Sequence, residues 1–135
     1  MTRREDWFVR LSGFLAVAER CAFVPGQFDC ALFAAGAVEA MTGVDLAAHW
    51  RGRYRSLRGG LRVLRSEGYR DHIDLVRAHF PPIAPSMAGV GDLGVIETDS
   101  GPALGLVLGP LVAVLKVGGG LDRVPLTRLE GAFRI

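Results

Sequence analysis

Apolar residues recur at steps of three and four in the first part of the chain, the spacing of one face of an α-helix. The first such segment is 6–22, and its apolar positions are Trp7, Phe8, Leu11, Phe14, Leu15 and Ala18. A second helix is predicted from Cys30 to Met41, because Asp29 suits an N-cap and Thr42-Gly43 suits the end. This second segment is apolar nearly all round, so we expect the helix to be buried.

The pattern changes after a proline-rich break at 81–85. Before the break, a short helical turn is predicted at 46–50, followed by helices at 61–67 and 71–79. After it, short β-branched and leucine-rich runs are separated by Gly, Pro, Asp or Ser, which predicts antiparallel strands. These runs are 93–98, 103–108, 112–117, 121–124 and 132–135.

The order of these elements predicts one α+β domain spanning residues 1–135, with a helical half at 1–85 and a β half at 86–135. We expect the N-terminal helices to pack on one face of a C-terminal antiparallel sheet. The longest uncharged stretch, 101–115, contains Gly and Pro and falls short of the roughly 20 apolar residues that cross a membrane. The first residues lack the apolar core of a signal peptide, so we expect synthesis in the cytoplasm.

The positive charge is almost entirely arginine: Lys116 is the only lysine among 16 basic residues, and the net charge is +2. Half of the basic residues lie between Arg51 and Arg77, interleaved with Tyr54 and Tyr69. Three interpretations stay open for this segment: a solvated helical face, a protein–protein contact, or a nucleic-acid surface. Nucleic acid is not the expected partner, because the pI of 8.8 is below the strongly basic range.

Cys30 is the candidate nucleophile, because it opens the second predicted helix. A helix N-terminus carries partial positive charge and unpaired N–H donors, which predicts a thiol pKa lowered from about 8.5. The alternative is a buried cysteine that packs as a small apolar side chain, which is what we expect for Cys21. Two cysteines provide no disulfide framework, and no Cys/His group has zinc-ligand spacing, so neither a metal nor a cofactor is expected.

The segment Phe23-Val24-Pro25-Gly26-Gln27-Phe28-Asp29-Cys30 resembles the nucleophile segment of the NlpC-type cell-wall cysteine peptidases, a papain-like family. Gly91-Asp92-Leu93 is similar to the turn that enters that family's first strand, and 103–109 is similar to its next strand. The segment 51–54, Arg-Gly-Arg-Tyr, resembles a subgroup associated with phages and gene-transfer agents. The resemblance implies an α+β fold of the papain-like NlpC type with Cys30 as the catalytic nucleophile.

The strand position that carries the general-base histidine in that family is Ala103 here. The following strand, 111–115, has no polar residue to orient a histidine. The histidines of this chain all lie in the helical half: His49, His72 and His79. We expect His72, which follows Asp71, in a solvated first helical turn. A substitute base requires one of these rings to reach the sulfur of Cys30 in the folded chain.

The resemblance implies two functions. The first is a tail-tip or hub component of a phage-like particle, carrying a degenerate peptidase domain that is inactive or weakly active because of Ala103. The alternative is an active peptidoglycan peptidase or amidase that uses Cys30 to help breach the cell wall. The implied partners are other tail-tip or hub proteins and peptidoglycan, and the implied location is the virion tail after synthesis in the host cytoplasm.

Overall fold

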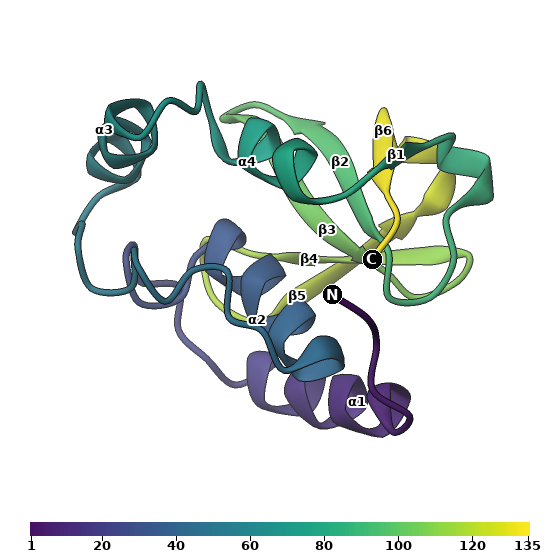
Figure 1. Cartoon of the computed structure of the whole chain (residues 1–135). Helices are drawn as coiled ribbons and strands as arrows, with labels where there is room; N and C mark the ends of the chain where they lie inside the picture. The colour runs from purple at the N-terminus through teal and green to yellow at the C-terminus, as the bar shows by residue number, and fades with distance from the viewer.

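The α+β class is confirmed in a computed structural model that describes residues 1–135 (Figure 1). The helices are α1 (Trp7–Ala18), α2 (Cys30–Thr42), α3 (Leu57–Ser66) and α4 (His72–His79). The strands are β1 (Pro82–Ile83), β2 (Leu93–Thr98), β3 (Gly101–Val107), β4 (Leu111–Leu115), β5 (Leu121–Pro125) and β6 (Gly131–Phe133). Short 3₁₀ turns, η1 (Pro85–Met87) and η2 (Leu126–Arg128), follow β1 and β5.

The strands form one antiparallel sheet with the order β1-β6-β2-β3-β4-β5. Strands β2 to β5 pair with their sequence neighbours, as expected, and β2 keeps its predicted bounds of 93–98. The final strand β6 lies between β1 and β2, where Phe133 is opposite both Pro82 and Leu93. The sequence missed β1 because Pro82 and the preceding Pro81 indicate a break, yet proline is tolerated on an edge strand.

The sheet has a helix-covered face and a loop-covered face. The buried residues of α1, α2 and α4, except Leu32, belong to one cluster with one face of the sheet, which includes Leu93, Leu104 and Leu106. Strand residues that point to the opposite face, such as Ile96 and Val107, form a smaller cluster there. There the strands are covered by segments around η1 and η2. The prediction that helices pack on one face is therefore confirmed for α1, α2 and α4.

The observed helices differ from the predicted ones at two places, and in both a local side-chain hydrogen bond explains the difference. The turn predicted as helix at 46–50 is not helical. There the Asp45 carboxylate accepts from the Ala47 N–H at 3.0 Å and from the Arg51 guanidinium at 2.9 Å, so it holds a non-helical turn. Helix α3 begins earlier than predicted because Ser56 caps it, with Oγ accepting from the Gly59 N–H at 2.9 Å.

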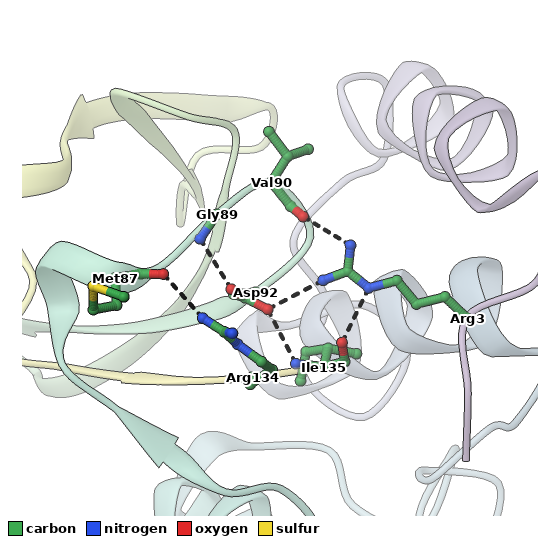
Figure 2. A network of polar contacts seen from close by, with 7 residues as sticks. All are labelled: Arg3, Met87, Gly89, Val90, Asp92, Arg134 and Ile135. Atoms are coloured by element: carbon green, nitrogen blue, oxygen red, sulfur yellow. Dashed lines mark hydrogen bonds and ion pairs between the residues drawn. The ribbon is translucent and has the colours of Figure 1, made fainter.

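A buried carboxylate joins the two ends of the chain to the turn before β2 (Figure 2). Asp92 accepts hydrogen bonds from the Arg3 guanidinium at 3.1 Å, the Ile135 N–H at 3.1 Å and the Gly89 N–H at 2.9 Å. Arg3 also donates to the backbone oxygens of Val90 and Ile135. We call Asp92, Arg3 and the backbone groups that they contact the polar lock.

No helix of the structure combines the length and the apolar composition required to span a bilayer.

Candidate functional site

Helix α2 begins at Cys30, as the sequence predicted, because Asp29 caps it. The Asp29 carboxylate accepts from the Leu32 N–H at 3.0 Å and is only 2% exposed. The same carboxylate accepts from the Gly26 N–H at 3.0 Å and from the Tyr54 hydroxyl at 2.5 Å. A buried carboxylate with three donors is fully satisfied. The three hydrogen bonds fix the position of Asp29, and Cys30 is the next residue in the chain.

The segment at 51–54 docks onto the loop before Cys30. The Gly52 N–H donates to the Gly26 carbonyl at 2.8 Å. Gly26 has a φ of +82°, and a Cβ at this position would lie 1.9 Å from the Tyr54 carbonyl oxygen. Only glycine therefore permits this close approach. Part of the arginine-rich region thus has a structural role, which is to hold the nucleophile loop through Tyr54 and Asp29.

His72 lies against Cys30, so the prediction that it is in a solvated helical turn is wrong. Its Nε2 is 3.6 Å from the Cys30 Sγ. His72 is the first residue of α4, which Asp71 caps by accepting from the Asp74 N–H at 2.8 Å. Both helices pack on the same face of the sheet, and this brings two residues separated by 42 positions together.

Burial keeps both members of this pair neutral. It raises the pKa of the Cys30 thiol to about 11, helped by the Asp29 charge and opposed by the backbone N–H of Leu104. Burial also lowers the pKa of the His72 imidazole below its usual 6.5, opposed by Asp71, Asp29 and a backbone hydrogen bond to Pro102. The expectation of a thiol pKa lowered by the helix N-terminus is thus corrected, because desolvation outweighs the helix field.

A neutral Cys30 thiol next to a neutral His72 imidazole is arranged so that the ring can take the thiol proton when the sulfur attacks a substrate. At pH 7 a neutral thiol lies 3.6 Å from Nε2 of a neutral imidazole, and the neutral ring is the form that accepts a proton. Cys30 as a whole residue is partly exposed. A backbone hydrogen bond with Pro102 also acts on the His72 ring, whereas the polar orienting residue that the resemblance implies is lacking from the strand at 111–115.

Alkylation should distinguish a neutral pair from a thiolate–imidazolium pair. In a Cys21→Ser variant, we expect the rate of Cys30 modification by iodoacetamide to rise about tenfold per pH unit from pH 7 to 10, because only the thiolate reacts and its pKa is about 11. The same variant unfolded in urea should react roughly a hundredfold faster at pH 7.5. A plateau in the folded protein by pH 7 would show a resting thiolate and contradict the neutral pair.

The structure places the other candidates elsewhere. Ala103 is on β3 opposite Ile96, which belongs to the cluster on the loop-covered face, so the Ala103 side chain lies on the face of the sheet away from Cys30. Its neighbour Leu104 belongs to the helix-covered face, and the Leu104 backbone N–H acts on Cys30. The His49 ring contacts Glu67 at 2.6 Å, and the His79 ring contacts the Leu75 carbonyl at 2.9 Å. Cys21 is a free thiol just beyond α1.

Sequence reasoning missed His72 because its contact with Cys30 is tertiary. The only local signal was Asp71, a helix-capping residue type that fixes the start of α4. No group of three or more His, Cys, Asp or Glu side chains is placed to hold a metal ion.

The family comparison covers nearly the whole chain. The model of a family described as a domain of unknown function, DUF6950, matches residues 2–135. No curated protein matches the chain.

Proposed function

This chain belongs to the DUF6950 family, and we propose that it is a cysteine-dependent hydrolase in which Cys30 attacks an acyl carbon and His72 moves the proton. The observation that supports this proposal is the 3.6 Å separation of Sγ and Nε2. A thiol within reach of an imidazole is the arrangement required for nucleophilic catalysis.

The proposed reaction has two steps. In acylation, the Cys30 sulfur bonds to the carbonyl carbon of an amide, His72 takes the thiol proton and then gives it to the leaving amine, and a thioester remains. In deacylation, His72 takes a proton from water, the hydroxide attacks the thioester, and the proton returns to the sulfur as the acid leaves. The Leu32 N–H is used by the Asp29 cap, but the N–H groups of Cys30 and Ala31 lack intrahelical partners and suit the negative charge that develops on the carbonyl oxygen.

The resemblance described above provides the substrate class and the setting for the proposal. We assign the chain a papain-like NlpC-type fold, peptidoglycan peptides as substrate, and a place at the tail tip or hub of a phage-like particle. Three features support this assignment: a cysteine opening a buried helix, a strand beside its sulfur, and helices packed on one face of an antiparallel sheet. The general base then comes from α4 instead of the strand.

A second candidate function is a tail component whose peptidase domain has become structural. One observation favours it: the raised pKa of the Cys30 thiol leaves little thiolate at neutral pH. This candidate predicts a folded protein without hydrolytic activity.

The experiment that separates the two uses purified peptidoglycan. The hydrolase proposal predicts release of soluble peptides by the native chain and no release by a Cys30→Ala variant, with unchanged thermal unfolding as a check of the fold. A Cys21→Ala variant is the matched control, because that thiol has no imidazole partner, and it should retain full activity. Release that survives Cys30→Ala, or no release by the native chain, would contradict the hydrolase proposal.

A further inference from the structure

The arginines between 51 and 77 fall into two sets in the structure. One set is ion-paired: Arg51 with Asp45, Arg53 with Glu67, and Arg70 and Arg77 with Asp74. The other set is exposed and has no carboxylate within 4.0 Å: Arg55, Arg58, Arg62 and Arg65. We call this second set the arginine row.

The arginine row lies along one side of α3. Arg58, Arg62 and Arg65 follow one another at steps of four and three, which keeps them within an arc of about 60° and a length of about 10 Å. Arg55 precedes the Ser56 cap. No acidic residue occurs between 55 and 66, so nothing local neutralises the row. Like charges at this spacing repel one another and destabilise a helix, and only Arg65, in the last turn, is favoured by the helix dipole.

The surroundings of the row are suited to a protein partner. At its end, Arg65, Gly68, Tyr69 and Arg70 line an open hollow of about 430 Å³. At its start, Leu57 is 54% exposed. Arg and Tyr are typical of protein interface centres. Helix α3 also lies at the margin of the molecule, away from the sheet (Figure 1), so a partner can approach without displacing another element.

We propose that the arginine row binds an acidic helix of a partner protein, whose carboxylates recur at steps of three and four. Guanidinium groups pair with carboxylates in a bidentate, planar geometry, and two helices side by side match each other's spacing. A nucleic-acid strand is a poorer fit, because the row ends after about 10 Å and the net charge is only +2. An anionic membrane is a poorer fit because Leu57 is the only large apolar residue exposed on α3.

The test measures binding of defined probes to the full chain at low ionic strength. The main probe is an alanine-based helical peptide whose glutamates repeat at steps of four and three. A second peptide of the same composition has its glutamates spread around the helix. We expect the first peptide to bind, the second to bind about tenfold more weakly, and added salt to weaken both.

Variants then locate the binding surface. The α3 variant, which carries both Arg58→Gln and Arg62→Gln, should bind the first peptide about tenfold more weakly than the native chain does. The matched control, Arg20→Gln with Arg128→Gln, removes the same charge from exposed arginines that are not in ion pairs, and it should bind as the native chain does. Thermal unfolding checks the fold, and the α3 variant should melt no lower than the native chain because repulsion is removed.

Three results would overturn the proposal. The first is equal affinity for the two peptides. The second is an equal loss of binding in the α3 variant and in its control. The third is tighter binding of a single-stranded oligonucleotide or of anionic vesicles than of the peptide, through the same arginines. Because none of these measurements uses hydrolysis, the outcome is independent of the proposed hydrolase function.

Discussion

An alanine in place of His72 is expected to lower kcat/KM for hydrolysis of a peptidoglycan-derived peptide by about 10²–10⁴-fold. The Cys30 thiol has a pKa of about 11, so at neutral pH it requires a neighbouring base to lose its proton during attack. Nε2 of His72 is the group at 3.6 Å. Without it, reaction depends on the small fraction of Cys30 that is already thiolate.

The pH dependence of the rate tests this role more sharply than the loss alone. The imidazole must be neutral to accept a proton, and its pKa is below the usual 6.5. Native kcat/KM should therefore be level near neutral pH and fall only in more acidic solution. In the His72→Ala variant this acid limb should disappear, and the residual rate should rise about tenfold per pH unit toward pH 11, following the thiolate.

His79→Ala is the matched control, because His79 is at the other end of the same helix, where its ring contacts the Leu75 carbonyl and Phe80 and not Cys30. It should retain native kinetics and the acid limb. His72→Gln, which keeps a polar side chain but provides no base, should behave as His72→Ala does. A His72 variant with native rates and a native pH profile would remove His72 from the mechanism.

Replacing Asp92 by alanine is expected to lower the free energy of unfolding by about 2–4 kcal/mol. The Asp92 side chain is almost fully buried, and the change leaves the Arg3 guanidinium and the Gly89 and Ile135 N–H groups without their acceptor. Arg3 is partly exposed, so water recovers some of the loss. Chemical denaturation measures the change, and the melting temperature should fall by about 10 °C.

Asp99→Ala is the control for the Asp92 prediction, because it removes the same charge from an exposed hairpin position and should change stability by less than about 0.5 kcal/mol. A double-mutant cycle then isolates the pair: Arg3→Ala with Asp92→Ala should cost less than the sum of the single changes, because the second change removes a partner that is already lost. Equal stability of the Asp92 and Asp99 variants would show that the polar lock contributes little.

The candidate site divides into a part that sequence predicts and a part that it does not. Asp29, Cys30 and the apolar run after them are contiguous, and capping chemistry fixes where the helix begins, so its position was predictable. The ionisation of Cys30 was not, because desolvation depends on what packs around the sulfur. Asp92 was identified only as part of a turn, since its partners are at positions 3 and 135.

The sequence by itself determined the helical and strand halves and the cap and start of α2, because each depends on residues within a few positions of one another. Tertiary structure alone decided the insertion of β6 between β1 and β2, the meeting of His72 with Cys30, and the division of the arginines into paired and unpaired sets. Those outcomes depend on how elements far apart in the chain pack on one sheet, and local pattern carries no information about such distances.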